Sequence, residues 1–145
     1  MSILYVAFKG NGNSGNKIVR SLSGDKVFLT NSYSGLKKDI ENINGTYDLV
    51  YMFGLDKGLK GNIRIDCVAG RGDEYLYSDV DFNSIAAKLN KSGIVANIGK
   101  IPTHYLCNEA YWYMLRKFNG HVVFFHVPSV KYITEDLIEK VRTVL

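Results

Sequence analysis

The chain is poor in cysteine and contains no motif for a structural metal. Its 145 residues include two cysteines, Cys67 and Cys107, whereas a secreted scaffold stapled by disulfides would carry more. No Cys-x-x-Cys pair occurs, so the sequence gives no support for a structural zinc site. The low cysteine content therefore favours a protein of a reducing compartment.

The chain also lacks a targeting segment and a long apolar run. Residues 1–8 are apolar, but they have neither the basic start nor the long hydrophobic stretch of a signal peptide. No apolar run approaches the roughly 18 residues that a membrane-spanning helix needs. We therefore expect a cytoplasmic protein with no membrane partner.

Charge is present, but it is not concentrated. The formal net charge is +4 and the pI is about 9.0, yet the Lys and Arg residues are scattered. A nucleic-acid partner would require a basic patch or stripe, so we expect none. The apolar fraction of 46% and the charged fraction of 22% are ordinary for a globular protein. The length fits one domain that spans residues 1–145.

Apolar runs alternate with segments of helical periodicity. Strands are expected at residues 3–8, 26–30, 47–53, 63–69, 94–98 and 121–126. Helices are expected at residues 16–22, 34–43, 81–90, 106–118 and 134–145, with Ser34 and Thr134 as caps. This alternation predicts a three-layer α/β/α domain with a mostly parallel central sheet, which binds ligands beyond the carboxyl ends of its strands.

A glycine-rich loop follows the first expected strand. Residues 10–15 read Gly-Asn-Gly-Asn-Ser-Gly, and G-x-G-x-x-G between a strand and a helix is the setting of a dinucleotide fingerprint. The second strand ends in Leu-Thr-Asn at residues 29–31, without the acidic residue that binds a ribose. A turn-forming loop is the simpler interpretation. A nucleotide-binding domain that uses Gly10, Gly12 and Gly15 remains an alternative.

Three residues have the chemistry of acyl transfer. Cys107 begins an expected helix, where free N–H groups lower a thiol pKa and can stabilise an oxyanion. His126 ends a very apolar strand, and Asp66 lies inside an apolar run, where a carboxylate needs a partner. Together they could serve as nucleophile, base and orienting group. Each also has a plain structural interpretation: a packing thiol, a core histidine and a partner of Arg64.

The motifs around these residues point to a family. Tyr-Leu-Cys-Asn at residues 105–108 precedes an aromatic-rich helix and Phe-His-Val-Pro at residues 125–128. This order resembles pyroglutamyl peptidase I (pyrrolidone-carboxylate peptidase), whose nucleophile lies in Tyr-x-Cys-Asn and whose base lies in His-Val-Pro. Residues 63–69, Ile-Arg-Ile-Asp-Cys-Val-Ala, are similar to the family stretch in which Glu is the third catalytic residue. Phe8 resembles the family's first pocket phenylalanine.

The resemblance implies a pyroglutamyl-peptidase-like fold, also described as phosphorylase-like, and a cysteine omega-peptidase without metal or cofactor. Cys107 would attack the carbonyl of an N-terminal pyroglutamyl or related cyclic acyl group. His126 would take the thiol proton, Asp66 would orient His126, and Phe8 would pack on the substrate ring. The partner would be a small peptide or amide substrate, and the oligomeric state stays open.

Several positions differ from the family pattern. The family clasps the pyroglutamyl ring between two phenylalanines, and here Asn11 stands where the second would be, so we expect Asn11 to contact the substrate. Asp66 is one methylene shorter than Glu, and Cys67, which we expect to pack, replaces an Arg. The chain could therefore be a divergent member that cleaves another amide, or one that only binds a ligand. An inert thiol at neutral pH would indicate binding without catalysis.

Overall fold

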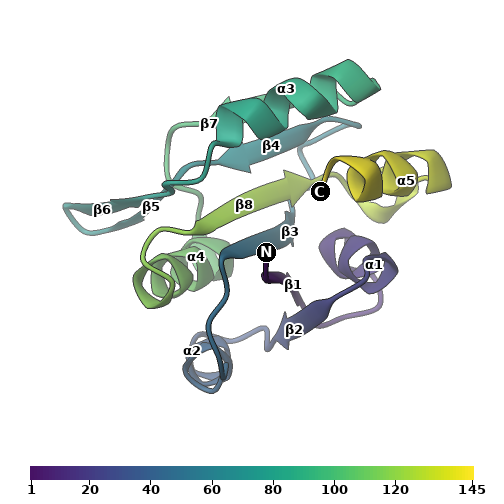
Figure 1. Cartoon of the computed structure of the whole chain (residues 1–145). Coiled ribbons are helices and arrows are strands. Elements are labelled where there is room, and N and C mark those ends of the chain that lie inside the picture. Colours follow the sequence, from purple (N-terminus) through teal and green to yellow (C-terminus); the bar gives the residue numbers. More distant parts are fainter.

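The apolar runs of the sequence form one central sheet (Figure 1). The computed structural model describes residues 1–145. The sheet has six strands in the order β2-β1-β3-β8-β4-β7. Strands β1, β2, β3 and β8 run parallel, whereas β4 and β7 run in the opposite direction. The bounds are β1 (Ile3–Phe8), β2 (Asp25–Leu29), β3 (Leu49–Leu55), β4 (Ile63–Asp66), β7 (Ala96–Gly99) and β8 (Val122–Val127).

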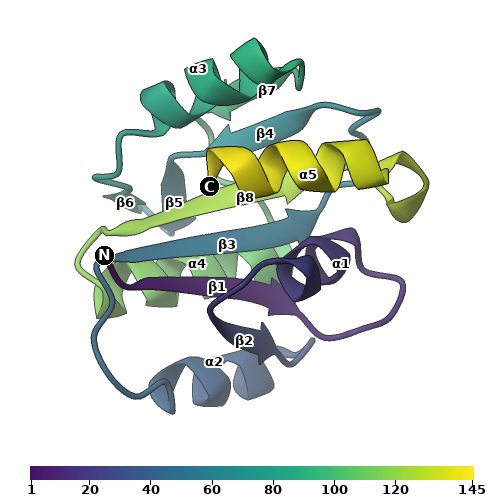
Figure 2. The same ribbon diagram turned by 45° about the vertical axis from the view of Figure 1, so that its right-hand side comes forward.

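Helices cover both faces of this sheet (Figures 1 and 2). One face buries a cluster of 21 apolar residues beneath α1, α3 and α5, and the other buries a cluster of 18 beneath α2 and α4. The predicted three-layer α/β architecture with a mostly parallel sheet is confirmed. The helices are α1 (Ser14–Ser21), α2 (Tyr33–Glu41), α3 (Phe82–Ser92), α4 (Tyr105–Lys117) and α5 (Glu135–Val144), with a short 3-10 turn, η1 (Val130–Tyr132).

The sequence of strand β8 is almost wholly apolar. All six of its residues are buried, because helices cover both of its faces. Side chains alternate along the strand, so Phe125 belongs to the cluster beneath α1, α3 and α5, whereas Phe124 belongs to the cluster beneath α2 and α4. The same alternation puts His126 on the α4 side, where its ring stacks on that of Phe124.

The prediction of one continuous strand over residues 63–69 was wrong. The chain leaves the sheet at Cys67, and β5 (Val68–Arg71) pairs antiparallel with β6 (Glu74–Tyr77) in a separate two-stranded hairpin. The side chain of Asn108 holds β5 there, since it accepts from the Gly70 N–H at 3.0 Å and donates to the Gly70 carbonyl at 2.7 Å. The apolar run at residues 63–69 carries no information about Asn108, which is distant in the sequence, so the break in the strand could not be predicted from it.

The helix boundaries shift by a few residues from those predicted. Helix α2 is capped by Ser32, whose Oγ accepts from the Gly35 N–H at 3.1 Å, and not by Ser34, which lies inside the helix. Helix α5 begins as expected, with Thr134 Oγ1 accepting from the Leu137 N–H at 3.1 Å. None of the helices combines the length and the apolar character needed to cross a lipid bilayer.

Candidate active site

Several residues of the candidate site lie at the carboxyl ends of the parallel strands, whereas Asp66 comes from the antiparallel strand β4. Phe8 ends β1, Leu55 ends β3, and His126 is the penultimate residue of β8. Cys107 is the third residue of α4, which packs on the same side of the sheet. The parallel strands thus deliver the ends of three separate segments to one edge, where a ligand site was expected.

Gly54 gives Cys107 its place over the sheet. The register of β3 and β8 sets Gly54 beside His126. A Cβ at Gly54 would lie 3.1 Å from the Cys107 Sγ and 2.7 Å from a ring carbon of Phe124. The thiol therefore rests against bare backbone, one strand away from the imidazole. A side chain at this position would displace the sulfur or the ring.

Cys107 is shared by two cavities. The larger, of about 700 Å³, is lined by Cys107, His126, Asp56 and residues 103–106 among others. The smaller, of about 220 Å³, is lined by Phe8, Asn13, Asn31, Leu55, Leu106 and Cys107. Cys107 therefore borders a cavity on each of two sides. This position suits a thiol that attacks a carbonyl carbon whose two substituents occupy the two cavities.

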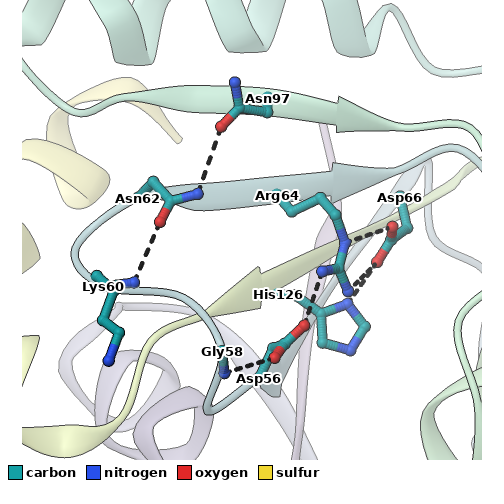
Figure 3. Close-up of polar contacts among 8 residues, drawn as sticks. All are labelled: Asp56, Gly58, Lys60, Asn62, Arg64, Asp66, Asn97 and His126. Atoms are coloured by element: carbon teal, nitrogen blue, oxygen red, sulfur yellow. Dashed lines mark hydrogen bonds and ion pairs between the residues drawn. The ribbon is translucent and has the colours of Figure 1, made fainter.

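His126 is held by a buried carboxylate (Figure 3). Its Nδ1 is hydrogen-bonded to Asp66 Oδ2, and the two side chains are only 2% and 1% exposed. Because Nδ1 faces the carboxylate, Nε2 is the nitrogen left to exchange a proton with another group. The Phe124 ring stacks on the imidazole with centroids 4.6 Å apart and planes 11° apart. The carboxylate and the Phe124 ring together fix the orientation of the imidazole.

The antiparallel course of β4 explains how the short side chain of Asp66 reaches His126. Across the β4–β8 ladder, Arg64 lies opposite His126 and Asp66 lies opposite Phe124. Asp66 therefore meets His126 on the diagonal, within reach of neighbouring side chains on one face. Gly99 on β7 leaves the space for the carboxylate, since a Cβ there would collide with Asp66 Oδ1.

Arg64 links Asp66 to a second carboxylate (Figure 3). Its Nε donates to Asp66 Oδ1 at 2.9 Å, and its Nη1 donates to Asp56 Oδ2 at 2.7 Å. Burial alone would raise the pKa of Asp56, but the hydrogen bonds from Arg64 and the Gly58 N–H outweigh it and lower that pKa. One guanidinium thus balances two carboxylates beside the imidazole.

The Cys107 thiol is more weakly acidic than the sequence led us to expect. Burial, with a smaller contribution from the nearby charge of Asp66, raises the pKa of Cys107 to about 12. Loss of water around the sulfur disfavours the thiolate by more than the start of a helix favours it. Cys107 is therefore a neutral thiol at neutral pH, and it could act as a nucleophile only with a base to take its proton.

The first turn of α4 offers unused donors. Helices α1, α2, α3 and α5 are each capped by a side chain, whereas the N-cap of α4, His104, makes no capping hydrogen bond. The N–H groups of Tyr105, Leu106 and Cys107 have no acceptor in the protein. Such free N–H groups next to a nucleophile are suited to bind an oxyanion.

The other predicted positions are placed as follows. Phe8 is 4% exposed and lines the smaller cavity, whereas Asn11 is exposed in the loop after β1 and lines no cavity. Cys67 is buried, with its Sγ 3.4 Å from the Gly99 carbonyl oxygen. In the glycine-rich loop, Gly15 allows α1 to approach β3, since a Cβ there would lie 2.7 Å from the Phe53 carbonyl oxygen. No group of His, Cys, Asp and Glu side chains converges so as to hold a metal ion.

Sequence reasoning missed three contributors to the site. Gly54 is one of them, because its place beside His126 depends on the β3–β8 register and not on its neighbours in the sequence. Arg64, which was expected as a partner of Asp66, forms that ion pair. Asn13 and Asn31 line the smaller cavity, although 18 positions separate them. Asn31 lies just beyond the carboxyl end of β2, which ends at Leu29. Because ligands bind beyond the carboxyl ends of parallel strands, Asn31 could have been predicted from its position.

The whole chain is similar to pyrrolidone carboxyl peptidases of known structure. The enzyme of Fervidobacterium islandicum superposes with a TM-score of 0.80 at 21% identity, over 99% of this chain and 94% of that one. The Thermus thermophilus structure gives 0.83 at 17% identity, over 98% and 96%. The Bacillus amyloliquefaciens pyroglutamyl peptidase I gives 0.75 at 12% identity, over 99% and 94%. No protein-family model and no curated protein matches the sequence. The chain therefore has the pyrrolidone carboxyl peptidase fold, in a divergent form.

Proposed function

We propose that the protein is a cysteine hydrolase that removes an N-terminal pyroglutamyl or related cyclic acyl group from a small peptide or amide. The observation that carries the proposal is the buried hydrogen bond between His126 and Asp66, on the wall of the cavity that also exposes Cys107. A carboxylate that holds Nδ1 of a histidine leaves Nε2 oriented to act as a general base. The similarity in fold to known peptidases of this specificity supports the same conclusion.

The first step forms a thioester. The Cys107 sulfur attacks the acyl carbonyl carbon while its proton passes to Nε2 of His126, and Asp66 stabilises the imidazolium that results. Because the resting thiol is neutral, this transfer accompanies the attack, as it does for a serine nucleophile. The carbonyl oxygen becomes an oxyanion, and the free N–H groups of the first turn of α4 are placed to bind it.

The second step restores the enzyme. The C–N bond breaks as His126 returns its proton to the leaving amine, and water then attacks the thioester with His126 again as base. The acyl ring would occupy the smaller cavity against Phe8, and the leaving peptide would extend into the larger one. Cys107 lies on the wall of both cavities, as cleavage between these two groups requires.

The test is release of a fluorescent amine from a pyroglutamyl amide in reducing buffer, for the wild type beside Cys107→Ser. We expect turnover in the wild type and a loss of at least about a thousandfold in the variant, since the thiol forms the covalent intermediate. Full activity of Cys107→Ser would exclude Cys107 as nucleophile. No turnover by the wild type would exclude the pyroglutamyl substrate.

The raised thiol pKa favours a second candidate, a relative that binds a ligand without catalysis. Alkylation of Cys107 by iodoacetamide in a Cys67→Ser background separates the two. We expect the rate in the free protein to rise about tenfold per pH unit from pH 7 to 9, because only the thiolate reacts. An alkylating substrate analogue that reacts quickly at pH 7, and loses this speed in His126→Ala, would indicate base-assisted catalysis. Equal slow reaction in both would indicate binding alone.

The same shift predicts the alkaline stability. The folded state holds the thiol proton more tightly than the unfolded chain, so Cys107 contributes stability below its ordinary pKa of 9.0 and loses it as pH rises toward about 12. Cys107→Ala should reduce this alkaline loss in a denaturant titration. An unchanged profile would contradict the raised pKa.

A further inference from the structure

The smaller cavity presents two amide side chains whose orientation is fixed by hydrogen bonds. Asn13 caps α1, and its Oδ1 accepts from the Asn16 N–H at 3.0 Å. Asn31 donates from Nδ2 to the Lys9 carbonyl oxygen at 2.8 Å. An amide side chain has one acceptor oxygen and one donor nitrogen, so each bond also settles which atom is left over. Asn13 keeps a free Nδ2 donor, and Asn31 keeps a free Oδ1 acceptor.

The remaining walls of this cavity are apolar. Phe8, which is 4% exposed, Leu55, Leu106 and Cys107 line the cavity beside the two amides. Asn13 is half-buried and Asn31 is exposed, so they place one donor and one acceptor at the rim of an otherwise apolar cavity. Such a rim is complementary to a small group that carries one carbonyl and one N–H. A lactam ring and a primary carboxamide are such groups, whereas a hydrocarbon ring would form no hydrogen bond with either asparagine.

We propose that Asn13 and Asn31 are the specificity residues of this site, and that they select an acyl group by its amide. Asn13 Nδ2 donates to the amide carbonyl oxygen of the acyl group, and Asn31 Oδ1 accepts from its N–H. This inference rests on the proposed function, in which the acyl group occupies the smaller cavity. Asn11, which we expected to contact the substrate, lines neither cavity, so we assign this selection to Asn13 and Asn31.

The decisive variant is Asn13→Asp. Aspartate keeps the oxygen that caps α1 and is an equally good N-cap, but it replaces the free donor by a second acceptor. We expect kcat/KM for a pyroglutamyl amide to fall by about 10- to 100-fold, the usual effect of one lost or repelled hydrogen bond to substrate. Hydrolysis of the matching cyclopentanecarbonyl amide, whose ring carries no carbonyl for Asn13 to bind, should not fall. Asn44→Asp, exposed and remote in sequence, adds the same charge as a control and should change neither.

Asn31 is tested by a pair of variants. Asn31→Ala should lower kcat/KM for the pyroglutamyl amide by about tenfold, and Asn31→Asp should restore most of it, because aspartate keeps an acceptor oxygen. If the hydrogen bond to Lys9 were the only role of Asn31, both variants would lose activity alike, since neither can donate to that carbonyl. That result, or equal effects of Asn13→Asp on both substrates, would overturn the proposal.

A binding experiment separates this proposal from the failure of catalysis. Protection of Cys107 from iodoacetamide at pH 8.5 requires no turnover, and 2-pyrrolidone and cyclopentanone are probes of similar size that differ in the N–H. We expect 2-pyrrolidone to protect the wild type better, and Asn13→Asp to lose that protection. Protection without pyroglutamyl hydrolysis would support the amide-selective cavity and reject the hydrolase. Equal protection by both probes would reject the role of Asn31, and unchanged protection in Asn13→Asp would reject the role of Asn13.

Discussion

The two faces of the central sheet bury different kinds of side chains. The face beneath α1, α3 and α5 is built on 21 buried apolar residues, with Phe125 of β8 among them. The face beneath α2 and α4 has a smaller apolar cluster, and beside its Phe124 it holds the buried pair Asp66 and His126. Two successive residues of one strand therefore have different surroundings: Phe124 packs on the polar pair, and Phe125 packs in the apolar cluster of the opposite face.

The two faces differ in what their buried side chains contribute to the stability of the fold. Apolar side chains stabilise the first face without needing exact partners, so many substitutions of similar volume should be tolerated there. A buried carboxylate and imidazole are tolerated only when each is hydrogen-bonded, and replacing them by apolar residues often stabilises a protein. Such a pair occurs on the α4 face alone, where Arg64 also contacts Asp66, and this is the face on which we propose the chemistry takes place.

The largest effect should follow from Asp66→Asn. The variant keeps the volume but loses the charge that orients His126 and stabilises its protonated form, so we expect kcat to fall by about 10³- to 10⁴-fold. The matched control is Asp79→Asn, which removes the carboxylate from the exposed pair Asp79–His121, 2.9 Å apart. That change should leave kcat as it is and alter stability by less than about 0.5 kcal/mol. Comparable kcat for the two variants would erase the contrast between a working and a surface Asp–His pair.

A smaller effect should distinguish the two neighbouring phenylalanines. Phe124 is fully buried and Phe125 is 1% exposed, so Leu at either position should lower the free energy of unfolding by about 1–2 kcal/mol through imperfect filling of the space. Only Phe124→Leu removes the ring that stacks on His126, so only it should also lower kcat, by about tenfold. Urea unfolding and steady-state kinetics on both variants provide the comparison. An equal loss of kcat in Phe125→Leu would show that the two faces are not independent.

The sequence predicts the architecture better than the site. Hydrophobic periodicity is local, so the strands, the helices and the mostly parallel sheet followed from it. The motifs around Cys107 and His126 identified two residues that line one cavity, whereas Asn11, expected to contact the substrate, is exposed and lines no cavity. The place of Gly54 beneath the thiol depends on the β3–β8 register, which no local pattern contains. The thiol pKa depends on burial by distant segments, and so the expectation from the helix start alone had the wrong sign.

The smallest effect concerns the one helix without a side-chain cap. His104→Ser introduces a hydroxyl at the N-cap of α4. In α2 the Ser32 hydroxyl accepts from the N–H three residues further on, and the equivalent donor here is Cys107. Tyr105, which has a φ of 57°, must turn to a helical conformation for this bond to form. We expect the helix to gain about 0.5–1 kcal/mol in stability, the usual contribution of a capping serine. The same bond occupies a donor assigned to the oxyanion, so kcat should fall by about tenfold while KM stays close to that of the wild type. Thr134→Ala, which removes the cap of α5, is the inverse control: it should lower stability by about 1 kcal/mol and leave kcat unchanged. If His104→Ser stabilised the protein without slowing it, the open first turn of α4 would be a structural accident, and the oxyanion would have to be bound by other groups.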